Sequence, residues 1–170
     1  MVNASRLGEY VKEVRQALRL GRRDCNVCLV SDREIKRLNS LYRGKARATD
    51  VLSFPWNAQR RPPRSHAGLF AGLRGGHPRA RSKPARPRPE NRGAKERAAS
   101  EFKNFLGDIV ISVDTAKRNA RQEGHSTLNE IRWLILHGLL HLLGYNHESD
   151  RGEMSRLELS LRSRLGISGD

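Results

Sequence analysis

The 170-residue sequence lacks any long apolar run. Its longest apolar stretch, Trp133 to Leu143, contains two histidines and is far shorter than the ~20 residues that a membrane-spanning helix needs. Residues 1–20 are interrupted by charged side chains, so they lack the continuous apolar core of a signal peptide. These absences exclude an integral membrane protein and predict a soluble, cytoplasmic one.

Cysteine is also scarce. The two cysteines, Cys25 and Cys28, have the Cys-x-x-Cys spacing that is typical of redox and zinc sites. They belong, however, to a short segment, Cys25 to Val30, whose composition predicts a β-strand, and strand positions three apart face opposite sides of a sheet. The two sulfurs are therefore expected to diverge, as small core or half-buried residues.

Acidic residues are few, and this deficit gives the chain its main electrostatic character. Against 33 basic residues stand 18 acidic ones, a formal net charge of +15 with a sequence pI near 11.1. Such a charge predicts a polyanionic partner, of which nucleic acid is the commonest. Residues 57–100 hold 12 basic and 2 acidic residues and six of the seven prolines. With few large apolar side chains, this insertion is expected to be mobile, either as an RNA-binding arm or as a passive spacer.

Outside residues 57–100 the hydrophobic periodicity predicts helices that alternate with strands. Strands are expected at Cys25–Val30, Thr49–Phe54 and Phe105–Val113. Helices are expected from Leu7 to near Gly21, from Ser31 through Leu41, from Asp114 to about Glu123, from Thr127 through His141, and from Asp150 to Leu165. Ser31 and Thr127 each precede a glutamate by three residues, as in a capping box, and Asp114 is expected to cap its own helix.

This order of elements predicts an α+β fold. Residues 1–170 are expected to form one small domain, interrupted by the insertion at 57–100. A short mixed sheet of about four strands would be covered by about five helices.

A cluster of three histidines, His137, His141 and His147, is the strongest chemical signal in the sequence. Residues four apart share one face of a helix, so His137 and His141 project together. Gly144 allows the chain to reverse after the helix and to bring His147 round as a third ligand. Three imidazole nitrogens with an open fourth position are typical of catalytic zinc. The pattern predicts one zinc ion on a central helix and the turn that follows it.

The same histidine spacing occurs in metzincin proteases, where a glutamate beside the first histidine acts as general base. Here Gly138 occupies that position, and glycine cannot accept a proton from a metal-bound water. Glu148 and Asp150 offer other carboxylates nearby, although capping the last helix is their commoner role. Peptidase activity is therefore the weaker alternative. Satisfied core histidines on an apolar helix are a further one.

The stretch from His137 to His147 resembles the signature of the YbeY family, which runs His-Gly-x-Leu-His-Leu-x-Gly-Tyr-Asp/Asn-His. Three further blocks resemble that family in the same order, at residues 38–45, 49–55 and 106–112. The resemblance covers most of the chain except residues 57 to about 103, where the family usually has a much shorter loop.

The resemblance implies a zinc-dependent endoribonuclease that cleaves single-stranded RNA during maturation of small-subunit (16S) ribosomal RNA and in ribosome quality control. It implies that His137, His141 and His147 hold zinc and that Arg43 is functionally important. A metal and a fixed guanidinium together can neutralise the charge that a phosphodiester gathers during cleavage. Metal-bound water and the 2′-hydroxyl of the RNA are both compatible with this site as nucleophile.

Further expectations concern neighbouring residues and the partners. Lys45 and Arg47 would add affinity for the RNA backbone, whereas Asp50 and Asp108 are expected to hold turns or to support neighbouring groups. The expected partners are ribosomal RNA and the small ribosomal subunit, with ribosomal proteins or GTPase assembly factors as further candidates. No membrane partner is expected, and the protein is expected to be a monomer.

Two function classes remain beside the endoribonuclease. One is a zinc hydrolase of peptide or amide bonds, which the ligand spacing favours and Gly138 disfavours. The other is a non-catalytic, ribosome-associated RNA-binding factor with a structural zinc, which the charge favours. Structural zinc sites usually have four protein ligands, and the sequence offers no obvious fourth.

Overall fold

The computed structural model describes residues 4–56, 103–145 and 151–167. Two compact units are distinguished by their contacts: Met1–Pro55 together with Leu106–Asp170, and Trp56–Phe105. Within the second unit, the rings of Trp56 and Phe105 pack edge to face with their centroids 5.9 Å apart. The predicted insertion at 57–100 lies outside the described residues, so its expected mobility stays a prediction.

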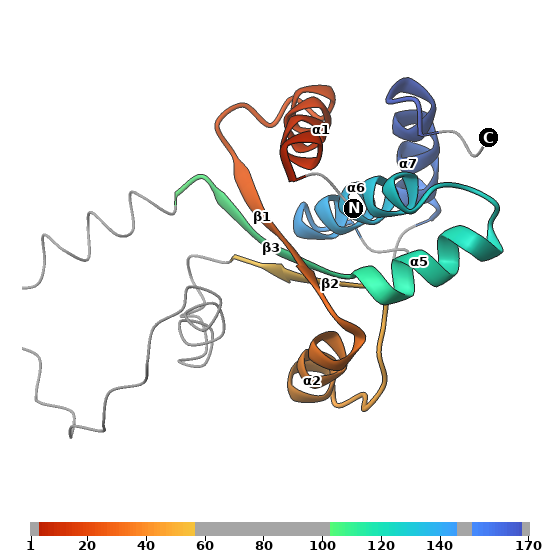
Figure 1. Cartoon of the computed structure of the whole chain (residues 1–170). Coiled ribbons are helices and arrows are strands. Elements are labelled where there is room, and N and C mark those ends of the chain that lie inside the picture. The colour runs from red at the N-terminus through yellow and green to blue at the C-terminus, as the bar shows by residue number, and fades with distance from the viewer. Residues whose placement is uncertain (1–3, 57–102, 146–150, 168–170) are drawn as a thin grey trace, which may run out of the picture. The chain divides into compact units, whose positions relative to one another are not determined.

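The described residues form five helices and three strands (Figure 1). The helices are α1 (Ala4–Ala17), α2 (Asp32–Arg43), α5 (Val113–Gln122), α6 (Thr127–Leu142) and α7 (Glu153–Arg164). The strands are β1 (Asp24–Val30), β2 (Val51–Pro55) and β3 (Phe105–Ser112). The predicted α+β class is confirmed, with three strands in the described part of the chain where about four were expected.

The sheet has the strand order β1-β3-β2. Strands β2 and β3 are antiparallel, with Leu52 opposite Val110. Strand β1 runs parallel to β3, and the helices that follow the two strands, α2 and α5, start side by side (Figure 1). At that point the Ser112 hydroxyl donates a hydrogen bond to the Asp32 carboxylate. The sheet is therefore mixed, as predicted. Its central strand, β3, is buried from Ile109 onward, which is typical of a strand covered on both faces.

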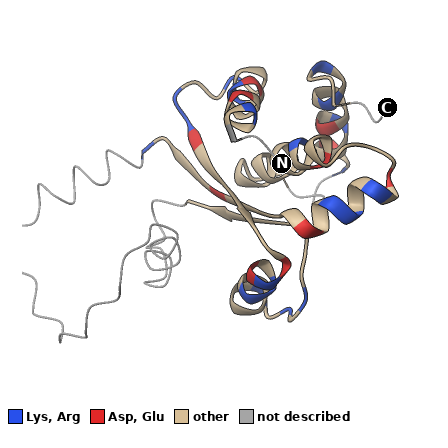
Figure 2. Cartoon of the chain, in the orientation of Figure 1, with Lys and Arg blue, Asp and Glu red and all other residues tan. Residues whose placement is uncertain are grey.

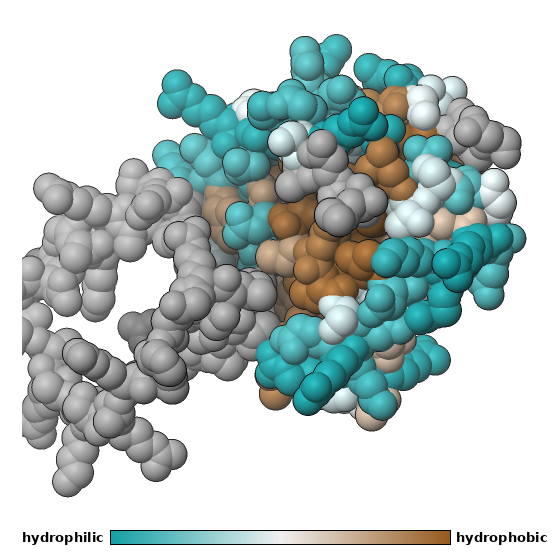
Figure 3. Space-filling model, in the orientation of Figure 1, coloured by the Kyte–Doolittle hydropathy of each residue, from teal (hydrophilic) through white to brown (hydrophobic). Residues whose placement is uncertain are grey.

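Helix α6 forms the centre of the hydrophobic core. Ile131, Ile135 and Leu139 on this helix are fully buried, and both β2 and α5 pack against it. In Figure 3 the apolar residues gather in the middle of the visible face, with hydrophilic residues around them. The helix that carries two of the predicted ligands is thus held by packing, and its histidines have a rigid support.

The helix caps confirm one prediction and correct two. The Ser31 hydroxyl accepts a hydrogen bond from the Glu34 amide, which confirms the N-cap half of the capping box, while the Glu34 carboxylate pairs with Arg37. Helix α5 is capped by Ser112, because Asp114 instead accepts a bond from the Asp32 amide. Helix α6 is capped by Ser126, the last residue with extended backbone, while the expected cap, Thr127, is already helical.

Several element boundaries also differ from the prediction. Helix α1 ends at Ala17, before the expected end near Gly21, and α7 begins at Glu153 after Gly152, which has a φ of 81°. Leu41 was expected on the buried side of α2 but is 56% exposed. The buried stripe of this helix runs through Ile35, Leu38 and Asn39 instead.

The structure confirms that the two cysteines are core or half-buried residues of a strand. Cys25 and Cys28 are both free thiols on β1, with Cys25 buried. Burial raises the pKa of the Cys25 thiol to about 11, and it also raises the pKa of Cys28. Neither residue has the low thiol pKa of a reactive cysteine.

Charged residues cover the outer faces of the helices (Figure 2). Lysine and arginine are prominent on α2 and α5 and in the turn between α1 and β1. No helix in the described ranges is long and apolar enough to cross a membrane.

Candidate metal centre

Two of the three predicted ligands lie together near the end of α6. The Nε2 atoms of His137 and His141 are 3.1 Å apart, and the two rings meet edge to face. This arrangement follows from the helical repeat, which places residues four apart on one face. The structure therefore brings His137 and His141 together as the spacing predicts.

The other nitrogen of each ring is held by the protein. Nδ1 of His137 lies 3.3 and 3.4 Å from the carboxylate oxygens of Glu158, and Nδ1 of His141 lies 3.0 Å from the carbonyl oxygen of Tyr145. A carboxylate and a carbonyl accept hydrogen bonds, so these contacts favour a proton on Nδ1 of each ring. The two Nε2 atoms face each other.

Two ring nitrogens at this separation can share one metal ion. Ligand atoms about 2.0–2.1 Å from a tetrahedral zinc ion lie about 3.3 Å from each other, close to the observed separation. Histidine ligands of zinc also usually donate their second ring N–H to a carboxylate or a backbone carbonyl. The donor atoms of His137 and His141 therefore fit a zinc ion.

The third predicted ligand, His147, lies outside the described residues, as do Glu148 and Asp150. Gly144 has a φ of 96°, so the chain does bend after α6 in a conformation that favours glycine. Among the residues that the structure describes, no group of three or more His, Cys, Asp or Glu side chains could hold a metal. The complete ligand set stays a prediction.

Glu158, on α7, was not singled out from the sequence. Its side chain also accepts a hydrogen bond from Nε1 of Trp133, and the residue is 8% exposed. Burial acts to raise the pKa of Glu158, but the hydrogen bonds from His137 and Trp133 outweigh it, so that this pKa is lowered. The sequence does contain one sign of its role: Glu158 lies between Met154 and Leu161 on the buried face of α7, where a carboxylate is unusual.

Gly138 lies where α6 presses on the sheet. A Cβ atom added at this position would be 2.7 Å from Cγ2 of Ile109 and 3.1 Å from the Ser53 hydroxyl. That hydroxyl donates a hydrogen bond to the Gly138 carbonyl, 3.1 Å away. There is no room for a glutamate here, so the general base of the metzincin motif is excluded at this position for a steric reason. The crowding at Gly138 therefore adds a packing reason to the argument against the peptidase alternative.

Arg43 is the last residue of α2, and its side chain is exposed. Within the described residues, it has no hydrogen bond or ion pair to either histidine. The chain after it turns at Gly44, and the side-chain amide of Asn39 donates to the Arg47 carbonyl, 2.9 Å away. The structure thus fixes the loop after Arg43 without joining Arg43 to the histidines, and its functional role stays a prediction.

Asp50 and Asp108 act as structural residues. Oδ1 of Asp50 accepts bonds from the Thr49 hydroxyl and the Val51 amide, which fixes the entry to β2. Oδ1 of Asp108 accepts a bond from the side chain of Asn26 and so ties β3 to β1.

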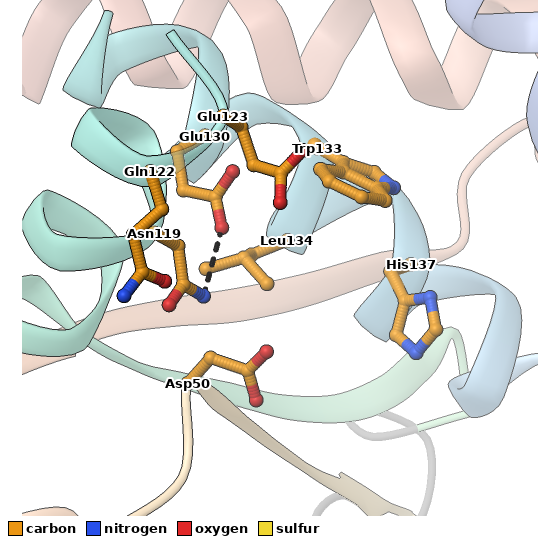
Figure 4. A pocket seen from close by; sticks show the side chains of 8 residues that line it. All are labelled: Asp50, Asn119, Gln122, Glu123, Glu130, Trp133, Leu134 and His137. Carbon is orange, nitrogen blue, oxygen red and sulfur yellow. Dashed lines mark hydrogen bonds between the residues drawn. The ribbon is translucent and has the colours of Figure 1, made fainter. Parts of the chain in front are cut away.

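A pocket of about 310 Å³ adjoins His137 (Figure 4). Asp50 lies on one side of it and Glu123 on the other, with Trp133 beside His137. Glu130, also in its lining, is 2% exposed, and burial raises its pKa. This pocket could not be predicted from the sequence, because its residues come from three separate segments of the chain.

Comparison with known proteins places the chain in a family. The family model described as Endoribonuclease YbeY matches residues 3–166. A Nautilia profundicola protein named Endoribonuclease YbeY is 40% identical over 145 residues, which are 85% of this chain and 74% of that protein. An Aquifex aeolicus protein of the same name is 33% identical, over 86% and 71% of the two chains.

A solved structure agrees with this placement at the level of the fold. The solution structure of a Thermotoga maritima protein matches with a TM-score of 0.52 at 24% identity, and the match covers 97% of this chain and 85% of that one. The family match and the two relatives together confirm the resemblance seen in the sequence. The chain belongs to the Endoribonuclease YbeY family.

Proposed function

We propose that this chain is a zinc-dependent endoribonuclease that hydrolyses phosphodiester bonds of single-stranded RNA. The endoribonuclease activity rests on membership of the family, whose curated members carry that name. The observation that supports the metal is the pair of Nε2 atoms 3.1 Å apart, with each Nδ1 facing an acceptor. We further propose maturation of 16S ribosomal RNA and ribosome quality control in the cytoplasm as its setting. Its partners would be the small subunit and ribosomal proteins or GTPase assembly factors.

His137, His141 and His147 would hold the ion. Bound zinc supplies Lewis acidity, which lowers the pKa of water and offsets negative charge on a phosphoryl oxygen. Glu158 and the Tyr145 carbonyl keep the two described rings in the tautomer that presents Nε2. These contacts also fix the ring planes, so that the ligands need little rearrangement on metal binding.

Arg43 would contribute the second positive charge of the site. Its guanidinium matches two oxygens of a phosphate group and stays charged at every physiological pH. Because Arg43 ends an amphipathic helix with an ordered cap at Gly44, its backbone position is fixed while its side chain is exposed to a substrate. Lys45 and Arg47, also exposed, extend the positive charge along the same loop.

The test compares the protein with three variants: His141→Ala, Arg43→Glu and, as a control, Arg33→Glu. Arg33 is exposed at the N-terminal end of α2, whereas Arg43 is the last residue of the same helix. Bound zinc is counted by elemental analysis, and cleavage of ribosomal RNA is followed on gels beside casein. We expect about one zinc per chain and RNA cleavage in the unaltered protein, with no cleavage of casein.

The variants separate the two halves of the site. His141→Ala should lose both zinc and cleavage, whereas Arg43→Glu should keep zinc and cleave about 100-fold more slowly. Arg33→Glu should behave like the unaltered protein. Casein cleavage would support a peptidase, and RNA binding without cleavage by any form would support a non-catalytic factor. A 2′,3′-cyclic phosphate end on the product would identify the RNA 2′-hydroxyl as the nucleophile and exclude water.

A further inference from the structure

The pocket beside His137 has a lining unlike that of a phosphate site. No lysine or arginine is among the described residues that line it, whereas Asp50, Glu123 and Glu130 each contribute a carboxylate. Acidic side chains repel a phosphate group, so this lining disfavours the backbone of an RNA strand. A neutral group with hydrogen-bond donors meets no such repulsion.

The remaining walls suit a flat, neutral ring. Trp133 lies beside His137 at one end of the pocket, and Leu134 adds an apolar surface (Figure 4). Arg162 lies over the ring of Trp133, with its guanidinium carbon 4.1 Å from the ring centroid, which fixes the indole in place. Asn119 and Gln122 add side-chain amides, which can both donate and accept. Nucleobases are recognised in proteins by this combination of an aromatic or apolar wall and polar groups at the base edge.

Glu130 is the buried carboxylate in the lining of this pocket. The residue is 2% exposed, and its Oε2 atom has no hydrogen-bond partner. Oε1 accepts a bond from Asn119, 3.1 Å away, while Oε2 lies 3.3 Å from Nε2 of His125 without the alignment of a hydrogen bond. A buried carboxylate oxygen normally has such a partner. Here that neighbour is Nε2 of His125, so Oε2 is closed to a ligand and Glu130 acts on the pocket through Asn119.

We propose that this pocket is a base-binding subsite that receives a guanine next to the phosphate cleaved at the metal centre. The inference rests on the proposed function, since it takes the substrate to be RNA. Carboxylates only accept hydrogen bonds. Guanine presents two adjacent donors, N1–H and the N2 amino group, whereas uracil presents one N–H between two acceptors. Cytosine and adenine each present one amino group beside an acceptor. The acidic lining therefore favours guanine and disfavours uracil.

Binding is measured first, through the fluorescence of Trp133. A Trp56→Phe background removes the other tryptophan of the chain. The probes are guanosine, inosine and uridine 5′-monophosphates, which share the phosphate and differ in the base. We expect guanosine monophosphate to quench Trp133 and inosine monophosphate, which lacks the N2 amino group, to bind about tenfold more weakly. Uridine monophosphate should give no saturable quenching.

Two variants and a control locate the effect. Glu123→Gln removes an exposed carboxylate of the pocket, and Glu130→Gln removes the buried one without a change of size. Each should reduce the preference for guanosine over inosine monophosphate to about twofold. Glu9→Gln, an exposed site on α1, should leave the preference unchanged. Equal binding of all three nucleotides, or a preference that survives both pocket variants, would overturn the proposal.

Cleavage then links the pocket to the metal centre. Oligouridine 10-mers with a single guanosine or a single inosine are compared as substrates. Faster cleavage next to guanosine, lost in Glu123→Gln, supports the subsite. Guanosine binding without any RNA cleavage would contradict the proposed function and keep the pocket assignment. Cleavage without base preference would support the proposed function and contradict the pocket assignment. Quenching by Mg²⁺ alone, with none by nucleotides, would show a cation site in its place.

Discussion

At the level of single residues, Gly138 shows how one absent side chain decides both packing and chemistry. It brings α6 close enough to the sheet for Ile109 and Ser53 to touch the helix backbone. The neighbouring histidines, His137 and His141, are thereby carried on a helix whose depth against the sheet is fixed. The same closeness leaves no space for the carboxylate that would make this motif a peptidase.

Gly138→Ala is therefore expected to destabilise the protein. The added Cβ would lie 2.7 Å from Cγ2 of Ile109, so the helix must move or the isoleucine must change its rotamer. Overpacking of this kind costs about 1–3 kcal/mol of unfolding free energy, which exceeds the ~1 kcal/mol that alanine gains over glycine within a helix. Urea unfolding followed by circular dichroism measures the difference.

Gly8→Ala is the matched control for this substitution. Gly8 lies within α1, and a Cβ added there meets nothing within 4 Å. It should raise the unfolding free energy by up to about 1 kcal/mol through helix propensity alone. If both substitutions stabilise the protein equally, the close packing of α6 against β3 is not a constraint on stability.

At the level of elements, local patterns predicted the helices well because their signals lie within a few residues. Ser31 caps α2 as its spacing indicates, and the periodicity of α6 placed His137 and His141 on one face. The predictions failed where contacts between distant segments determine the role of a residue. Asp114 does not cap α5 because its carboxylate is engaged by the Asp32 amide, 82 residues away in the sequence. The role of Glu158 could not be predicted, because only the packing of α7 on α6 brings its carboxylate to His137.

The Asp32 carboxylate links three elements, α2, β3 and α5. Its carboxylate forms an ion pair with Arg118 at 2.7 Å and accepts bonds from the hydroxyls of Ser112 and Thr115. Hydrogen bonds from Arg118, then Ser112 and Thr115, lower the pKa of Asp32 to about 2. A carboxylate whose pKa is lower in the folded state contributes stability above its unfolded pKa, near 3.9, and loses it as the pH falls toward 2.

Asp32→Asn should thus cost about 1–2 kcal/mol of unfolding free energy at pH 7, because one partly exposed charged network is lost. The difference from the unaltered protein should shrink between pH 4 and pH 2. Urea midpoints measured across this range test the trend. Glu9→Gln, which breaks an exposed ion pair with Lys12, should change stability by less than about 0.5 kcal/mol. A constant difference for Asp32→Asn at all pH values would contradict the assignment.

At the level of the whole molecule, the positive charge is concentrated in one segment. Residues 57–100 carry a net charge of +10 out of +15. Composition revealed this concentration, but composition alone does not distinguish an RNA-binding arm from a spacer. In a similar way, the histidine motif indicated a metal site while the pocket beside it, assembled from β2, α5 and α6 and their flanking residues, could not be foreseen. Such features depend on how distant segments pack.

Deletion of residues 57–100 distinguishes the arm from the spacer. The register of the sheet places Pro55 opposite Gly107 on neighbouring antiparallel strands, so Trp56 and residues 101–106 suffice to connect β2 to β3. Each lysine or arginine that contacts a phosphate releases counterions, which contributes about 0.7 to the slope of log K against log salt for a single strand. If the segment binds RNA, its deletion should flatten that slope by several such steps while the unfolding free energy and the zinc content stay the same. Filter binding of single-stranded ribosomal RNA between 50 and 200 mM salt, a range over which such contacts change affinity by orders of magnitude, provides the measurement. An unchanged slope would identify the segment as a spacer and would leave Arg43, Lys45 and Arg47 as the principal candidates for RNA contact.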